Sequence, residues 1–180
     1  MANIFFTADL HFGHKNILLF ENRCRCDKET LETRPFKDVS EMDNYIIQRW
    51  NSTVDKTDTV FIAGDLSFYD KEKTTNVVQR LKGTKILIKG NHDTKSNQWY
   101  RDVGIKEVSG YPIIVNEWFA IQHEPPTFYN EHCPYFYIYG HVHNCEMYQT
   151  YTKRSCCVCV ERHDYTPVLF DDIKSMIAKA

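Results

Sequence analysis

Residues 85–93 read KILIKGNHD, an apolar run that stops at a glycine and a set of polar side chains. The run predicts a buried strand over 85–88, with the polar residues just beyond its carboxyl end. Two upstream stretches have the same form, TVFIAGD at 59–65 and NIFFTADLH at 3–11. We therefore expect three buried strands, each followed at once by side chains that can bind a ligand.

The segments between these strands predict helices. Ser40 can cap a helix over about 41–53, in which apolar side chains recur at helical spacing. Asp70 can cap a second helix that ends near Gly83. Because strands and helices alternate, we expect right-handed crossovers and a parallel sheet.

The second half of the chain predicts mainly strands. Apolar runs at 111–115 and 118–122 flank Asn116-Glu117 and predict a hairpin. Further strands are expected at 135–139, 147–152 and 156–160, and a short terminal helix at Asp171 or Asp172. Together the elements predict an α/β sandwich of two sheets with helices outside, in one domain over residues 1–180.

Composition limits the class of protein. The chain is 42% hydrophobic and 26% charged, as is typical of a soluble globular protein. Its formal charge of -2 and pI of about 6.4 argue against a nucleic-acid binder that works by bulk charge. No apolar stretch is long enough to span a membrane. Seven cysteines, two of them adjacent, favour a reducing compartment, so we expect a cytoplasmic protein.

The polar clusters all stand where apolar runs stop. Ligands of α/β proteins gather at the carboxyl ends of strands, so clusters far apart in sequence can converge there. Residues two apart on an extended segment point to the same side, and a glycine before a cluster permits a positive φ or close approach of the backbone. The clusters are Asp9 and His11, Gly64-Asp65, Gly90-Asn91-His92-Asp93, His123, and Gly140-His141-Val142-His143.

These side chains suit divalent metal ions. Carboxylate, imidazole and amide oxygen together favour Mn, Fe, Zn or Ni, and we expect two divalent ions with Mn favoured. Taken singly, each cluster has an ordinary interpretation: Gly64-Asp65 is a common turn, and Asn91 or Asp93 could cap a helix. Their ordered conjunction favours a metal centre. The cysteines lack C-x-x-C spacing, so no additional zinc site is expected.

The ordered pattern D-x-H, G-D, G-N-H-D, H and G-H-x-H resembles the calcineurin-like metallophosphoesterase superfamily. The resemblance implies a four-layer αββα sandwich of two mixed β-sheets flanked by helices, with a binuclear centre. It implies that a hydroxide between the ions is the nucleophile, that His92 assists the leaving group and that Asp93 could orient His92. One ion would be bound by Asp9, His11, Asp65 and His143, and the other by Asp65, Asn91, His123 and His141.

The segment around His14 resembles a small single-domain branch of the superfamily from bacteria and phages. His14 could reach the substrate or simply cap the following helix. The Arg-Pro-Phe of that branch matches Arg34-Pro35-Phe36, but Arg23 could be the same feature displaced by an insertion over about 24–33. Either arginine could bind a phosphate, together with Asn91 and His92.

The expected activity is hydrolysis of a phosphodiester in a small molecule, such as a cyclic or bridged nucleotide. A phosphomonoesterase is the nearest alternative, and a nuclease that acts on single strands is another. Lys89 and Asp93 replace the Arg and Glu that protein phosphatases of the superfamily place around Gly-Asn-His. A non-catalytic scaffold predicts missing ligands, yet every motif residue is present. The partner is a small phosphoester, with no membrane and no oligomeric state indicated.

Overall fold

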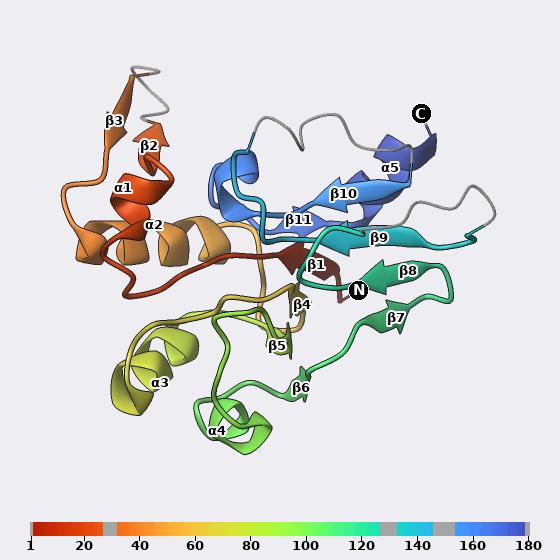
Figure 1. The fold of residues 1–180 in the computed structure, drawn as a ribbon, viewed down its shortest axis with the longest axis horizontal. Helices are drawn as coiled ribbons and strands as arrows, with labels where there is room; N and C mark the ends of the chain where they lie inside the picture. The colour runs from red at the N-terminus through yellow and green to blue at the C-terminus, as the bar shows by residue number, and fades with distance from the viewer. Residues whose placement is uncertain (1, 27–31, 127–132, 146–153, 179–180) are drawn as a thin grey trace.

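The first sheet contains the three predicted strands side by side. The computed structural model describes residues 2–26, 32–126, 133–145 and 154–178. Five strands lie in the order β11-β1-β4-β5-β6, and β11 alone runs antiparallel to its neighbour (Figure 1). Their bounds are β1 Ile4–Thr7, β4 Thr59–Ile62, β5 Thr84–Ile88, β6 Glu107–Ser109 and β11 Val168–Leu169.

Two crossover helices cover the outer face of this sheet (Figure 1). The helix between β1 and β4 is α2, Val39–Asn51, and the helix between β4 and β5 is α3, Lys71–Arg80. The predicted cap of α3 is confirmed, since the Asp70 side chain accepts a hydrogen bond from the backbone of Lys73. The predicted cap of α2 was wrong. Asp38 has the extended backbone of a cap, and its carboxylate accepts from the Glu41 N–H, whereas Ser40 lies within the first turn.

The second sheet has the order β10-β9-β8-β7. Its strands are β7 Ile113–Val115, β8 Phe119–Ile121, β9 Phe136–Tyr139 and β10 Ser155–Cys157. The predicted hairpin is confirmed, because β7 and β8 pair antiparallel, and the other pairs are parallel. The strand predicted at 156–160 is shorter and begins one residue earlier, and Val160 starts a 3-10 helix, η2, Val160–His163. The strand predicted at 147–152 lies outside the described residues.

Alternating side chains of the first sheet fill two cores. Val60 and Ile62 pack toward α2 and α3, whereas Phe61 and Ala63 pack toward the second sheet. The last helix, α5, Phe170–Ala178, packs beside β1 and β11 and adds Phe170 to the core between the sheets. Two mixed sheets thus face each other with helices outside, which confirms the predicted fold class.

Several short elements were predicted without bounds or not at all. They are the ribbon of β2, Cys24–Cys26, and β3, Thr33–Pro35, and the helices α1, Ile17–Phe20, and α4, Asn97–Asp102. β2 and the first residue of β3 fall within about 24–33, the region that we considered as a possible insertion. Among the helices described, none combines the length and the apolar character that crossing a membrane demands.

Candidate metal centre

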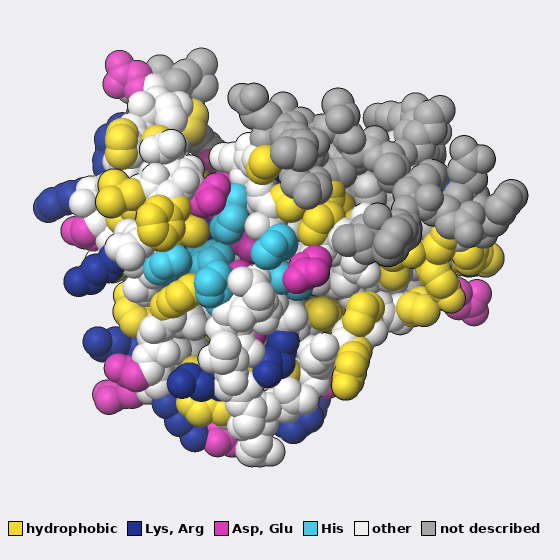
Figure 2. All heavy atoms as spheres, in the orientation of Figure 1, with side chains coloured by type: hydrophobic (Ala, Val, Ile, Leu, Met, Phe, Trp, Pro, Cys, Tyr) yellow, Lys and Arg dark blue, Asp and Glu magenta, His cyan; other side chains and the backbone are white. Residues whose placement is uncertain are grey.

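The seven predicted metal ligands converge at one edge of the sandwich, where Figure 2 shows the histidines gathered on one face. The parallel strands β1, β4 and β5 end there, and the loops after β8 and β9 meet them. Asp9 and His11 follow β1, Asp65 follows β4, Asn91 follows β5, His123 follows β8, and His141 and His143 follow β9.

Five of the seven predicted ligands have a left-handed backbone. Their φ values are 58° at Asp9, 51° at His11, 58° at Asp65, 73° at His141 and 43° at His143. Such values are uncommon outside glycine and are typically held in place by surrounding structure at functional sites. Here the Asp9 N–H donates to the Gly64 carbonyl and the His11 N–H donates to the Asp65 carbonyl. The two loops therefore fix each other's conformation.

The motif glycines make room for the ligand side chains. A Cβ atom at Gly90 would overlap the carboxylate of Asp65, and one at Gly140 would overlap the carboxylate of Asp9. Gly64 in addition has φ of +95°, which favours glycine. Close approach of the backbone to the ligands explains why glycines occupy these positions.

One group of donor atoms surrounds Asp9. The donor atoms of Asp9, His11 and His143 all lie within 4.8 Å of one another. The Nε2 atoms of His11 and His143 each lie 3.8 Å from Asp9 Oδ1. Both Asp9 Oδ1 and His11 Nε2 are buried and have no hydrogen-bond partner, which is costly for polar atoms. Two donors bound to one ion at about 2.1 Å lie roughly 3.0 to 3.5 Å apart, so only a small adjustment is needed to hold an ion.

A second group surrounds Asn91. Its Oδ1 lies 2.8 Å from His123 Nε2 and 3.1 Å from His141 Nδ1, and His123 Nε2 lies 3.5 Å from Asp65 Oδ2. Asn91 and His141 are exposed, whereas His123 and Asp65 are buried. The second group is therefore the more solvent-exposed part of the cluster.

Further contacts orient two of the histidines. His123 Nδ1 lies 2.8 Å from the carbonyl oxygen of Ala63, and His143 Nδ1 lies 2.8 Å from Glu161 Oε1. Because each Nδ1 has a hydrogen-bond acceptor, Nε2 remains available to a metal ion. The other oxygen of Asp9 accepts from the His141 N–H at 2.8 Å and from the Cys159 thiol.

The sequence did not predict the buried ion pair between Arg23 and Glu161. The Arg23 side chain is fully buried, its Nε donates to Glu161 Oε1 at 2.7 Å, and its guanidinium also donates to the backbone carbonyls of Asp9 and Leu10. Arg23, a candidate phosphate ligand from the sequence, therefore lies behind the ligand loop. The other candidate, Arg34, is exposed on β3 and pairs with Glu41.

His14 and His92 border the first group of ligands. His14 Nδ1 lies 3.2 Å from His11 Nδ1, and its ring stacks on Phe68 with centroids 3.9 Å apart. The His92 ring is exposed, 5.6 Å from that of His11. Both histidines thus stand beside the cluster, and their predicted contact with a substrate stays a prediction.

Asp93 contacts other partners than the predicted one. Its two carboxylate oxygens accept hydrogen bonds from the backbone N–H groups of Asp65, Leu66 and Gly90 and from the Tyr100 hydroxyl. We expected Asp93 to orient His92. In the structure it instead ties the loop after β5 to the loop after β4, and so positions Asp65.

Burial and neighbouring groups shift the pKa values of the cluster residues. Burial and the neighbouring charge of Asp9 raise the pKa of Asp65 to about 6. Burial lowers the pKa of His11 to about 4, so its ring is neutral near neutral pH and can bind an ion. Burial opposes protonation of His143, but its hydrogen bond to Glu161 prevails and raises the pKa of His143 to about 9.

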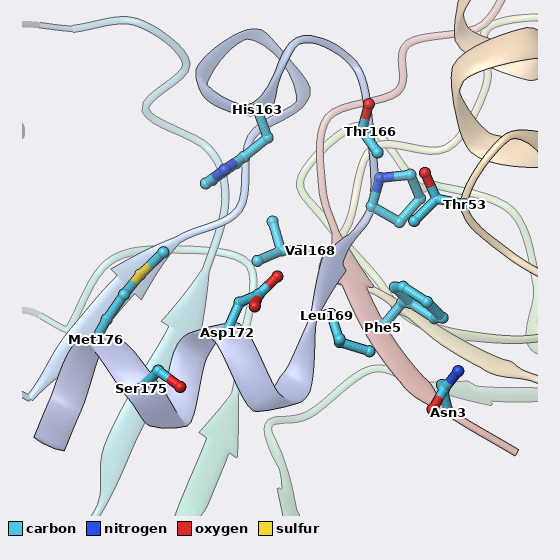
Figure 3. Close-up of a pocket in the computed structure, with 11 residues that line it drawn as sticks. Asn3, Phe5, Thr53, His163, Thr166, Val168, Leu169, Asp172, Ser175 and Met176 are labelled. Atoms are coloured by element: carbon cyan, nitrogen blue, oxygen red, sulfur yellow. The ribbon is translucent and has the colours of Figure 1, made fainter. Parts of the chain in front are cut away.

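A large cavity of about 710 Å³ lies away from this cluster. Figure 3 shows Asp172 and Ser175 lining it from α5, Phe5 from β1, and Asn3 from just before that strand. Asn3 and Phe5 lie at the opposite end of β1 from Asp9. The cavity contains one histidine, His163, whose Nε2 lies 2.8 Å from the Cys157 carbonyl oxygen. It offers no cluster of metal ligands among the described residues.

Comparison with known proteins places the chain in a family. Residues 2–154 match the family described as calcineurin-like phosphoesterase. The chain is 31% identical over 186 residues to the uncharacterized protein MJ1445 of Methanocaldococcus jannaschii, covering 99% of this chain and 93% of that protein. It is 35% identical over 96 residues to the gene 66 protein of Mycobacterium phage L5, covering 52% of this chain and 41% of that protein.

A solved structure shares the fold. The protein of unknown function AQ665 from Aquifex aeolicus aligns over 98% of this chain and all of its own, with a TM-score of 0.68 at 20% identity. The family match covers most of the chain, and two groups of donor atoms that could hold a metal ion, Asp9–His11–His143 and Asp9–Asp65–His123, lie at the site. The chain belongs to the calcineurin-like phosphoesterase family and is a metal-dependent phosphoesterase.

Proposed function

We propose that this protein is a phosphodiesterase with two divalent metal ions bound side by side. One observation carries the proposal: Asp65 Oδ2 lies 3.5 Å from His11 Nε2 and 3.5 Å from His123 Nε2. A single carboxylate oxygen thus stands between a histidine of each ligand group. This is the position that a bridging ligand of a two-metal site requires.

The two groups define the ligands of each ion. Asp9, His11, Asp65 and His143 would hold one ion, and Asp65, Asn91, His123 and His141 the other. Their oxygen and imidazole donors suit Mn, and also Fe, Zn or Ni. When bound, the ions would lower the pKa of a water that attacks phosphorus and would neutralise the charge that develops on the phosphate.

The proton for the leaving group would come from His92. Its backbone N–H donates to Asp65 Oδ1 at 3.0 Å, so its position is tied to that of the shared ligand while its ring stays exposed. A histidine at such a rim can protonate the leaving oxygen as the P–O bond breaks.

His14 would have two roles. If His11 binds an ion through Nε2, its Nδ1 carries the proton and donates to His14 Nδ1, which lies 3.2 Å away. The His14 ring then orients His11 and keeps its own Nε2–H as a donor for a phosphate oxygen. Burial lowers the pKa of His14, which favours this neutral form.

The surroundings of the cluster favour a diester over a monoester. Cavities of about 570 and 390 Å³ lie on two sides of it, the first lined by His92 and the second by Asn91 and His123. A phosphodiester carries two esterified groups, one for each of these two cavities. A monoester carries a second negative charge, but Arg23 is paired with Glu161 and Arg34 with Glu41. Neither arginine is available to neutralise that charge.

The proposal is tested with protein that is stripped of metal and then reloaded with Mn²⁺. We expect turnover of bis(p-nitrophenyl) phosphate and of cyclic nucleotides to exceed that of p-nitrophenyl phosphate. His92→Ala should lower kcat for cyclic nucleotides by about 100-fold, because their alkoxide leaving group, unlike p-nitrophenolate, must take up a proton. Asn91→Ala should lower activity and metal content, and the matched control Asn97→Ala, on exposed α4, should lower neither. Turnover of the monoester alone, or full activity after chelation, would contradict the proposal.

A further inference from the structure

A second cavity adjoins the metal cluster on the side of His92. Its volume is about 570 Å³, and it lies between the segment that leads into α3 and the segment that leads into α4. Its walls include Phe68, Lys71, His92, Lys95 and Trp99, and we call it the aromatic–lysine cavity. Because His92 belongs both to its wall and to the rim of the cluster, a group attached to a phosphate at the metals can extend into it.

Two aromatic side chains line this cavity. Phe68 is 42% exposed, although large hydrophobic side chains are usually buried. Its ring stacks on His14 and lies 5.1 Å from the ring of His92, so it is held in place by candidate catalytic side chains. Trp99 is half-buried and packs edge-on against Tyr100 with centroids 5.0 Å apart. Fixed aromatic faces of this kind bind nucleobases by stacking.

The charged groups of the cavity favour an anion. Lys71 and Lys95 are exposed in its wall, and Figure 2 shows Lys and Arg side chains on the same face as the histidines. Lys71 pairs with Asp102, whereas no ion pair of Lys95 with a carboxylate occurs within the described ranges. The carboxylate of Asp70 is engaged, since it accepts from the backbone of Lys73. Lys95 is therefore the side chain best placed to bind a phosphate.

We propose that the aromatic–lysine cavity binds the leaving-group nucleotide of the substrate, with the base against Phe68 and Trp99 and a further phosphate at Lys95. The proposal rests on the diesterase function above and narrows its substrate class to linear dinucleotides with a terminal phosphate. Water adds its oxygen to phosphorus and the P–O bond to the leaving nucleotide breaks. The leaving oxygen takes a proton through His92, and the second proton of water is released with the new phosphomonoester.

The base contact is tested with two dinucleotides that are identical except that one lacks the base on the leaving side. Trp99→Leu should lower kcat/KM for the complete dinucleotide about tenfold and leave the abasic analogue unchanged. The comparison is made within one variant, so a loss of folded protein cancels. Trp118→Leu, which changes a tryptophan that is 54% exposed and lies outside the cavity, is the control.

The phosphate contact is tested with the same dinucleotide with and without its terminal phosphate. Lys95→Met should lower kcat/KM about fivefold only when the phosphate is present, and the exposed control Lys56→Met should have no effect. Equal effects of Trp99→Leu and Lys95→Met on all substrates, or no effect on any, would overturn the subsite while the diesterase function stands. A wild-type enzyme that hydrolyses only monoesters would instead overturn both.

Discussion

His143 Nδ1 lies 2.8 Å from Glu161 Oε1, and the carboxylate of Glu161 lies 2.6 Å from the guanidinium of the buried Arg23. This chain of contacts connects η2 to the loop after β1, because Arg23 also donates to the backbone carbonyls of Asp9 and Leu10. Glu161 thereby fixes the ring of one candidate ligand and the backbone of another. We interpret it as the principal positioning residue of the site.

Glu161 should make metal binding depend on pH. Its carboxylate raises the pKa of His143 to about 9, so the ring carries a proton at pH 7 in the metal-free protein. An ion must displace that proton, and lowering the pH favours the protonated ring over the metal-bound one. The affinity for Mn²⁺ should therefore rise by about tenfold per pH unit up to about pH 9.

Titrations with Mn²⁺ between pH 6 and 9 measure this effect. In Glu161→Gln, His143 stays buried but loses the negative charge beside it, so the pKa of His143 should fall. The affinity for Mn²⁺ should then stop rising near or below pH 6.5. Glu107→Gln, on the exposed end of β6, is the control and should keep the wild-type profile. Identical profiles for wild type and Glu161→Gln would show that Glu161 does not control the proton on His143.

Gly90 should tolerate no side chain. Gly90→Ala places a methyl group against the Asp65 carboxylate and its backbone nitrogen, so the shared ligand must move. We expect Mn²⁺ content and diesterase activity to fall at least tenfold, with a loss of about 1–3 kcal/mol in the free energy of unfolding. Gly110→Ala is a matched control, since a Cβ there meets nothing within 4 Å. Equal metal content in both variants would count against the arrangement of Asp65.

Asp93 should act through Asp65 rather than through His92. Asp93→Asn replaces one acceptor oxygen with an N–H group that faces backbone N–H donors, which should cost about 1–3 kcal/mol in chemical denaturation. Tyr100→Phe removes only one of the four hydrogen bonds and should cost about 1 kcal/mol. If Asp93→Asn kept full stability and metal content and changed only the pH profile of kcat, a direct role with His92 would be the better account.

The sequence predicts the parts of the structure that depend on local pattern. The apolar run that begins at 59 stops at Gly64, where the chain turns to bring Asp65 into the cluster. The run of β5 likewise stops before Gly90, which precedes Asn91. The i and i+2 spacing of Asp9 with His11 brought both into one cluster, although through left-handed backbone at each residue rather than through an extended segment. Strand ends in an α/β sheet thus made the convergence of distant clusters predictable.

Other features depend on contacts that no local pattern records. Arg23 and Glu161 are 138 positions apart, and only the fold shows that the arginine is buried and needs a carboxylate. The cap of α2 was missed because Asp38 and Ser40 both suit a cap, and the choice depends on the extended backbone with which the chain enters at Asp38. The partners of Asp93 likewise lie on another loop.

The central claim is that two ions share Asp65, and it is tested most directly by the number of Mn²⁺ ions bound per chain. Calorimetric titration of metal-free wild-type protein should give two bound ions per chain. Asn91→Ala removes a ligand of the second group only, so this variant should bind one ion. A wild-type protein that binds a single ion, with Asn91→Ala unchanged, would contradict the account.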